Sequence, residues 1–233
     1  MEAEYIMKIT WLGQAGLLFD NGKVKIMIDP YLSNSVERVD PTKYRRVPVN
    51  EEIFGIEPEV MIFTHDHLDH YDPDTAQVFL AEDRAPMTVL CPSSVWQKAR
   101  QHAKKHNYVL FNGGTEWTEW GFRFRAVSAI HSDHYAIGVI IEDLVDKRTY
   151  YVSGDTLYGR AIFSELPENI DVAFLPINGV GNNMNAADAK RFFEACGAVR
   201  VVPYHVGMLD DMSADILDAD EQIILEIYRE TEV

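Results

Sequence analysis

The sequence predicts an α+β fold in which two β-sheets pack together and helices lie on the outside. Three observations support this prediction. The N-terminal third contains short strand-like runs, two of them joined by the hairpin signal Asn21-Gly22. From residue 59 onward strands alternate with helices, and a series of strands occupies residues 108–152. Strands in two groups, each with helices of its own, are typical of packed sheets covered by helices.

The individual elements follow from the spacing of apolar residues. Short apolar or alternating runs predict strands at residues 8–11, 15–19, 24–28, 59–63, 87–90, 108–111, 122–127, 136–141, 149–152, 172–176 and 199–203. Helical spacing predicts helices at residues 74–81, 93–106, 158–166 and 186–196, and a terminal helix after residue 209. Asn185, with Asp188 three residues later, marks the start of the fourth helix.

Composition limits the classes of partner and the compartment. The 233 residues include 37 acidic and 21 basic side chains, which give a net charge of −16. Such a surface repels a phosphate backbone, so we expect no nucleic-acid partner. The N-terminus lacks the pattern of a secretory signal, and no apolar run is long enough to span a membrane. We expect a cytoplasmic protein without a membrane partner, in which Cys91 and Cys196 are unpaired thiols. The sequence leaves homo-oligomerisation open.

The last 25 residues are strongly acidic. Residues 209–233 contain nine acidic side chains and one arginine. Apolar residues recur there at roughly helical spacing, namely Ile216, Leu217, Ile223, Ile224 and Ile227. This stripe favours a helix with a solvated acidic face over a detached acidic docking tail.

A dense group of metal-binding side chains follows the strand expected at residues 59–63. The segment reads Thr64-His65-Asp66-His67-Leu68-Asp69-His70. Alternate residues of an extended loop point the same way, so His65 and His67 can reach one ion, and Asp69 and His70 a second. Imidazole and carboxylate ligands suit zinc, manganese or iron rather than calcium. So many polar groups at the end of a buried strand would be costly to desolvate without a metal.

This segment resembles the His-x-His-x-Asp-His signature of the metallo-β-lactamase fold superfamily. Three later residues, each after an expected strand, match the remaining ligands of that family: His131, Asp155 and His205. The resemblance covers nearly the whole chain. It implies one domain, residues 1–233, with the four-layer αββα sandwich of the family and a site at the sheet edges.

The resemblance also implies a ligand set for two divalent metal ions. The first ion would be bound by His65, His67 and His131. The second ion would be bound by Asp69, His70 and His205, and Asp155 would bridge the two ions. We expect zinc or manganese, and iron also fits these ligands. Two such ions hold a shared water as hydroxide and polarise the bond that it attacks. Asp69 is then also the candidate catalytic carboxylate, which orients the hydroxide and carries its proton to the leaving group.

Several other polar residues fit either a functional or a purely structural role. His102 and His106 lie four apart on an expected helix, but the two lysines between them favour a solvated face. His134 either lines the cleft and contacts substrate or is an ordinary loop residue. Asp29, before Pro30, resembles the early aspartate of the family, and it equally fits a turn that ends a strand.

Within the superfamily, the sequence is most similar to the ascorbate-6-phosphate lactonase-like branch. The segments that carry this likeness are residues 10–16 (TWLGQAG), 28–33 (IDPYLS), 175–179 (LPING) and 182–185 (NNMN). An aspartate rather than a cysteine at position 155 argues against the antibiotic-hydrolysing branch. The likeness implies a binuclear metal-dependent hydrolase that acts on a small ester or lactone, including a phosphorylated sugar lactone.

Asn178, Asn183 and Asn185 are candidate substrate contacts, because they precede a helix N-terminus where an anionic group is favoured. Turn and cap chemistry is the alternative for all three. Two bound cations would make the cleft less acidic than the molecule as a whole, so we expect a small-molecule substrate that can be anionic. Two other functions stay open: a phosphodiesterase with the same metals, and a non-catalytic protein that binds metal or ligand.

Overall fold

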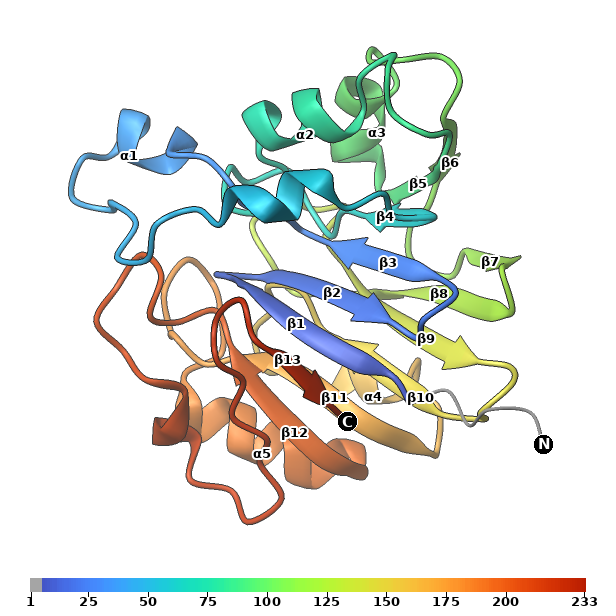
Figure 1. The fold of residues 1–233 in the computed structure, drawn as a ribbon. Helices are drawn as coiled ribbons and strands as arrows, with labels where there is room; N and C mark the ends of the chain where they lie inside the picture. Colours follow the sequence, from blue (N-terminus) through green and yellow to red (C-terminus); the bar gives the residue numbers. More distant parts are fainter. Residues whose placement is uncertain (1–5) are drawn as a thin grey trace.

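The computed structural model describes residues 6–233, in which two β-sheets pack face to face (Figure 1). The first sheet has the order β13-β1-β2-β3-β4-β5-β6. Its strands are β1 Lys8–Gly13, β2 Gly16–Asp20, β3 Lys25–Ile28, β4 Val60–Ile62, β5 Thr88–Cys91, β6 Asn107–Leu110 and β13 Glu230–Glu232. The second sheet has the order β12-β11-β10-β9-β8-β7. Its strands are β7 Glu116–Glu119, β8 Phe122–Ser128, β9 Ile137–Asp143, β10 Thr149–Val152, β11 Ile170–Pro176 and β12 Ala198–Tyr204.

The turn between β2 and β3 confirms the hairpin that Asn21-Gly22 predicts. The two strands pair antiparallel. Gly22 adopts a φ of 80°, which costs a glycine little, and its backbone N donates to the Asp20 carboxylate. The Asn21 side chain accepts from the backbone N of Val24, as turn-forming asparagines commonly do.

Large aromatic side chains fill the space between the sheets. Phe19 of β2 lies 5.5 Å from Tyr150 of β10 and 5.4 Å from Phe174 of β11, measured between ring centroids. All three side chains are fully buried. Rings of this size contribute much of the apolar burial of a core, so these contacts join the two sheets firmly.

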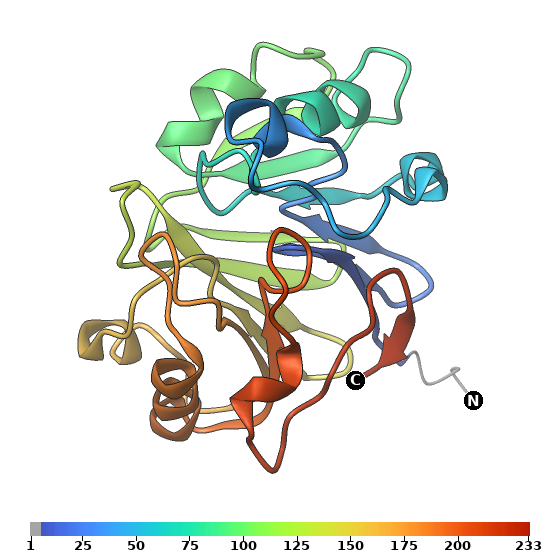
Figure 2. The same ribbon diagram turned by 90° about the vertical axis from the view of Figure 1, so that its left-hand side faces the viewer.

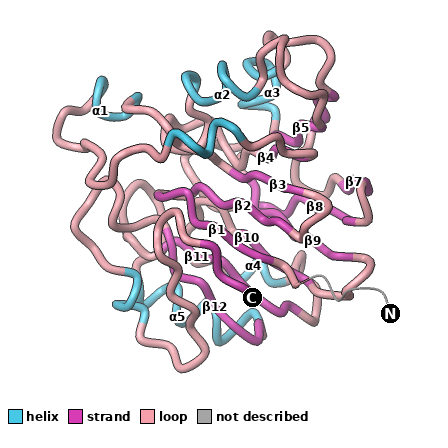
Figure 3. The backbone as a smooth tube through the Cα atoms, viewed as in Figure 1, coloured by secondary structure: helices cyan, strands magenta, loops and turns pink. Residues whose placement is uncertain are grey.

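Helices cover the outer face of each sheet, which confirms the expected αββα layers (Figures 2 and 3). α2 (Pro73–Phe79) and α3 (Ser93–Ala99) pack on the first sheet, and α4 (Arg160–Phe163) and α5 (Ala186–Cys196) pack on the second. The start of α5 agrees with its prediction, because the Asn185 side chain accepts from the backbone N of Asp188. α1 (Ser35–Val39) lies apart from these layers, beyond the strand ends.

The carboxyl ends of six strands meet at one edge of the sandwich. β3 and β4 run parallel, as do β10, β11 and β12. β8 runs in the same direction as β10, because both are antiparallel to β9. The segments that follow these six ends therefore lie close together, although they come from distant parts of the sequence.

The prediction of a terminal helix is wrong. Residues 209–233 form a 3-10 turn, Ala214–Leu217, and the short strand β13. Between them the chain follows the sheet edges: Ile223 N donates to Val201 O of β12, and Tyr228 N donates to Trp11 O of β1. These bonds satisfy backbone groups that an edge strand would leave exposed, and this segment covers both edges where a helix could not. The acidic side chains remain largely at the surface.

The helix predicted at residues 93–106 is too long. α3 ends at Ala99, and His106 is not on a solvated face: it is buried, and its Nδ1 accepts from the backbone N of Met87. The sequence pattern also did not reveal α1, β7 or the 3-10 turn Glu51–Gly55. Within the described residues, no helix is long and apolar enough to cross a membrane.

Candidate metal centre

The seven predicted metal ligands lie together at the shared edge of the strands. The loop after β4 supplies His65, His67, Asp69 and His70, and the loops after β8, β10 and β12 supply one ligand each. Their ligand atoms form three groups, within each of which all atoms lie within 4.8 Å of one another: His65, His67 and His131; His65, His70 and Asp155; and Asp69, His70 and His205. The groups overlap at His65 and His70, so they form one continuous cluster.

The first group brings three imidazole rings into contact. The His131 Nε2 and His67 Nδ1 atoms are 3.2 Å apart, and the ring centroids of His65 and His131 are 4.6 Å apart. In their neutral forms, each of these rings carries one nitrogen lone pair that can coordinate a metal. This group matches the ligand set expected for the first ion.

The second and third groups share His70, and Asp155 of the second group also contacts His205 of the third. Its Oδ1 atom lies 3.2 Å from His70 Nε2 and 3.1 Å from His205 Nε2. These two imidazole nitrogens are themselves only 3.1 Å apart. Asp69 completes the third group, with its Oδ2 atom 3.4 Å from His205 Nε2. Asp155 also groups with His65, so it lies beside residues expected to bind each of the two ions.

The unsatisfied atoms of the cluster fit a bound cation. The His65 Nε2 atom is buried and has no hydrogen-bond partner in the protein. Burial and the nearby His70 hold the pKa of His65 well below its usual range, so the ring is neutral. A neutral, buried imidazole with a free nitrogen is costly unless a metal or a water occupies that position. This donor set suits a divalent transition metal.

The carboxylates of the cluster raise the pKa of two of its histidines. Burial alone would lower the pKa of His205, but Asp155 and Asp69 outweigh it and raise the pKa to about 9. Burial is likewise outweighed for His70 by Asp155 and Asp29, so its pKa is also raised. The pKa of Asp69 falls because His70 and His205 outweigh its burial. The centre therefore attracts positive charge strongly, whether that charge comes from protons or from metal ions.

Asp29 orients His70. It follows β3, and its Oδ2 atom accepts from His70 Nδ1 at 2.7 Å. The backbone N of Thr64 donates to Asp29 Oδ1 at 2.8 Å, and the Thr64 hydroxyl donates to Asp29 Oδ2. With its Nδ1–H held, His70 presents Nε2 to the cluster, as second-sphere carboxylates do for metal-binding histidines. Both readings of Asp29 therefore hold, since it ends a strand and supports the metal-binding loop.

Gln14 is a site residue that sequence reasoning missed. It lies in the tight turn between β1 and β2, where its φ is 49°. Its Nε2 atom donates to Asp69 Oδ2 at 2.9 Å and lies 3.2 Å from His205 Nδ1. Its Oε1 atom is buried without a partner. A polar residue in a turn that calls for positive φ was the one signal available in the sequence.

Asp133 is a second missed residue, and it joins three segments. Its Oδ2 atom accepts from the backbone N of Asp66 at 3.2 Å and from the Ser94 hydroxyl at 2.5 Å. Its Oδ1 atom accepts from the backbone N of Tyr135. Asp133 thereby connects the His131 loop to the metal-binding loop and to α3. No sequence pattern indicates this role, because the three segments meet only in the fold.

The four candidate substrate contacts have different positions. Asn178 lines the cavity described below, and its Nδ2 atom lies 3.0 Å from His205 Nδ1. Asn183 is buried and donates to Asp155 Oδ2 at 2.8 Å. Asn185 caps α5 and His134 is exposed, and neither is among the residues that line the cavity. Asn178 stays a candidate contact, Asn183 supports a ligand, and the structure does not bring Asn185 or His134 to the site.

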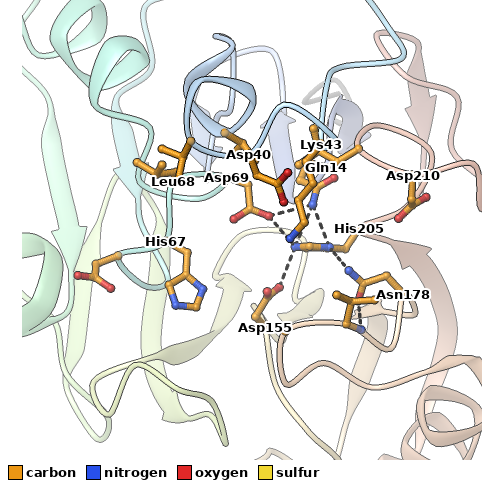
Figure 4. Close-up of a pocket in the computed structure, with 16 residues that line it drawn as sticks. Gln14, Asp40, Lys43, His67, Leu68, Asp69, Asp155, Asn178, His205 and Asp210 are labelled. Atoms are coloured by element: carbon orange, nitrogen blue, oxygen red, sulfur yellow. Dashed lines mark hydrogen bonds and ion pairs between the residues drawn. The ribbon is translucent and has the colours of Figure 1, made fainter.

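A cavity of ≈ 600 Å³ opens onto the cluster (Figure 4). Asp69, Asp155, His205 and His67 form its inner part, together with Gln14. This volume lies within the range of about 300–1,000 Å³ that is usual for small-molecule sites. The metal ligands are thus accessible to a small molecule from one side.

Comparison with known proteins agrees with this geometry. Residues 25–206 match the family model described as "Beta-lactamase superfamily domain". The chain is 30% identical to a UPF0173 protein of Pyrococcus furiosus over 206 residues, which covers 86% of this chain and 84% of that protein. It is 27% identical to a UPF0173 metal-dependent hydrolase of Oenococcus oeni, with 93% of each chain covered.

A solved structure shows the same fold. Igni18, a metallo hydrolase from the archaeon Ignicoccus hospitalis, superimposes with a TM-score of 0.76 at 18% identity, covering 97% of this chain and 98% of that one. The family match spans most of the sequence, and all seven ligand positions are filled by residues that meet in space. The chain therefore belongs to the metallo-β-lactamase fold superfamily and, within it, to the UPF0173 family of metal-dependent hydrolases.

Proposed function

We propose that this protein is a binuclear metal-dependent hydrolase that opens a small ester or lactone. The observation that carries the proposal is the overlap of the three ligand groups at His65 and His70, with Asp155 grouped with His65 of the first ligand set and in contact with His70 and His205 of the second. One isolated triad would hold a single ion, whereas this arrangement has enough ligands for two. Two bound cations would supply an activated water and a Lewis acid at the base of the cavity.

The chain's own residues then have separate tasks. Asp29 and Thr64 keep His70 oriented, and Asn183 holds Asp155 through its Oδ2 atom. Asp69 lies beside the cavity with its side chain 21% exposed. Its lowered pKa keeps Asp69 ionised, and its place beside the cavity lets the carboxylate orient the attacking water and carry a proton to the leaving group. Gln14 fixes the orientation of that carboxylate.

The first test is metal content. Protein purified without chelator, and the same protein reconstituted with zinc or manganese, should hold two ions per chain by elemental analysis. Asp155→Ala should lose at least one of them, while His134→Ala, a change at an exposed histidine outside the cavity, should keep both. A reconstituted parent protein with less than one ion per chain contradicts the binuclear centre.

The second test is reaction type. We expect turnover of esters and lactones by the metal-loaded protein, and Asp69→Asn should lower kcat by about 100-fold or more. An Asp69→Asn protein with full metal content and full turnover would remove Asp69 from the mechanism. Turnover of phosphodiesters alone would make the protein a phosphodiesterase. Tight metal binding without turnover of either class would identify a non-catalytic binding protein.

A further inference from the structure

The outer part of the cavity is lined by apolar side chains from four separate segments. Val36 and Val39 come from α1, Leu68 from the metal-binding loop, Val180 from the loop after β11, and Leu209 from the segment after β12. Val39 is 75% exposed and Val180 is 56% exposed. Apolar surface is thus presented to solvent directly above the metal ligands.

This clustering points to an apolar occupant. Single exposed apolar residues are common on proteins and need no explanation. Five apolar residues that line one cavity, two exposed and three partly exposed, are different, because covering apolar surface is favourable by about 25 cal/mol per Å². The inner part of the same cavity is polar, so a bound molecule would place a polar group at the ligands and an apolar group outside.

The outer part of the cavity carries more acidic than basic side chains. Asp40, Asp66 and Asp210 line it, and among the described lining residues Lys43 is the only cation (Figure 4). Hydrogen bonds from Thr42 lower the pKa of Asp40, which is therefore ionised at neutral pH. Asp66 is paired with Lys98 at 2.8 Å, so Asp40 and Asp210 remain to repel an anionic group at the opening, whereas two bound metal ions would attract one at the ligands.

Among the three asparagines proposed as substrate contacts, Asn178 alone lines the cavity. The Asn185 side chain is used to cap α5, and Asn183 is committed to Asp155. The lining of the cavity does not include the first residues of α5. The N-terminus of α5 thus does not contribute to this cavity, and Asn178 stays a candidate contact.

We propose that the substrate is an uncharged ester or lactone with an apolar group of several carbons, which binds against Val36, Val39, Leu68, Val180 and Leu209. This inference rests on the proposed function and narrows its substrate class to one without phosphate. In the reaction the water oxygen bonds to the acyl carbon and the acyl C–O bond breaks. One water proton passes to the alcohol oxygen, and the second is released as the acid ionises.

The test uses the metal-loaded protein and a series of 4-nitrophenyl esters from acetate to hexanoate, alkyl-substituted lactones of the same range, and a phosphorylated sugar lactone. We expect kcat/KM to rise about two- to fourfold per methylene, because that is the effect of burying a CH₂ group in part or in full. Val39→Asp and Val180→Asp should flatten this rise.

Matched controls separate the cavity from general effects of the substitution. Val145 is 75% exposed, as Val39 is, and Val199 is 62% exposed; neither lines the cavity. Val145→Asp and Val199→Asp should retain the chain-length dependence of the parent protein. All variants are exposed-site changes, and their metal content is measured alongside activity.

Each outcome has one meaning. A flat or falling chain-length series, faster turnover of the phosphorylated lactone, or equal flattening by the control variants overturns the inference and leaves the hydrolase in place. No turnover of any ester or lactone by protein that holds its metal overturns the proposed function, and the inference with it.

Discussion

At the residue scale, Asp29 shows how a side chain that binds no metal can set metal affinity. It is buried and accepts from His70 Nδ1 and from both donors of Thr64. In Asp29→Asn, one of these acceptors becomes an amide donor, so at least one bond is lost. We expect zinc or manganese affinity to fall about 10- to 100-fold, as for other partners of metal-binding histidines. Metal titration of the apo-protein measures this.

Asp72→Asn is the matched control for Asp29→Asn. Asp72 is also a buried carboxylate, but it accepts from Ser33, Asp74 and Thr75 at the start of α2. Its replacement should lower the free energy of unfolding and leave metal affinity unchanged. If Asp29→Asn binds metal as tightly as the parent protein, Asp29 does not support the centre.

The raised pKa values of His70 and His205 predict proton release on metal binding. An unfolded histidine has a pKa of about 6.5, so these two groups stabilise the metal-free protein fully below that pH. The contribution of His205 is lost as the pH rises through about 9. A metal ligand must be unprotonated, so binding at pH 7 displaces protons and apparent affinity should increase from pH 7 to 9.

Calorimetry in two buffers with different ionisation enthalpies counts the released protons. We expect about one to two per chain at pH 7 and fewer at pH 9, because both raised histidines must lose their protons. Equal heats in the two buffers at pH 7 would show that His70 and His205 are already neutral, contrary to their place beside Asp155.

The sequence identified the ligands better than it identified the residues that support them. His65, His67, Asp69 and His70 form a dense motif, and the later three ligands each follow a strand, so residue type and position both reveal them. Gln14 and Asp133 lack such a signal, because each works through contacts across the fold. Cap and substrate roles of Asn185 could not be separated by sequence, since both suit an asparagine before a helix.

At the element scale, the buried strands were predictable and the covering segments were not. Apolar or alternating runs marked every strand of the two sheets except β7, whose residues are half-buried or exposed, and β13, which lies in the terminal segment. The prediction of a helix in the terminal segment was wrong for a different reason. Its apolar residues are spaced as in a helix, but unpaired edges of β1 and β12 offer backbone partners that sequence spacing does not reveal.

Two neighbouring residues distinguish the predicted helix from the observed edge-covering structure of the terminal segment. In the predicted helix Ile224 belongs to the buried stripe, whereas in the structure it is 44% exposed and Leu225 is 2% exposed. Leu225→Ala should lower the free energy of unfolding by about 2–4 kcal/mol, as for a buried leucine. Ile224→Ala should lower it by less than about 1 kcal/mol. Urea unfolding of the two variants measures both values. A larger loss of unfolding free energy for Ile224→Ala than for Leu225→Ala would support the predicted helix instead.

At the scale of the whole molecule, the fold brings distant ligands to one place and leaves the acidic charge outside. Residues from His65 to His205 meet only when both sheets have formed and packed. Metal binding is therefore coupled to folding of the sandwich. The chain has a net charge of −16, and Asp40 and Asp210 bring negative charge to the opening of the cavity.

This charge predicts a salt dependence that differs between substrates. A neutral 4-nitrophenyl butyrate meets no net force on its approach, whereas the 4-nitrophenyl half-ester of succinic acid is repelled. At an ionic strength of 0.01 M charges act over about 30 Å, and at 1 M over about 3 Å. Raising the salt concentration across this range should therefore increase kcat/KM for the succinate ester severalfold, within the range of electrostatic effects on association rates. For the butyrate the change should stay below about 1.5-fold, because screening acts only on charged reactants. Initial rates at constant metal loading and pH measure both slopes. If the succinate ester is the better substrate at low salt, the bound metals dominate the field at the cavity, and the acidic surface does not select against anions.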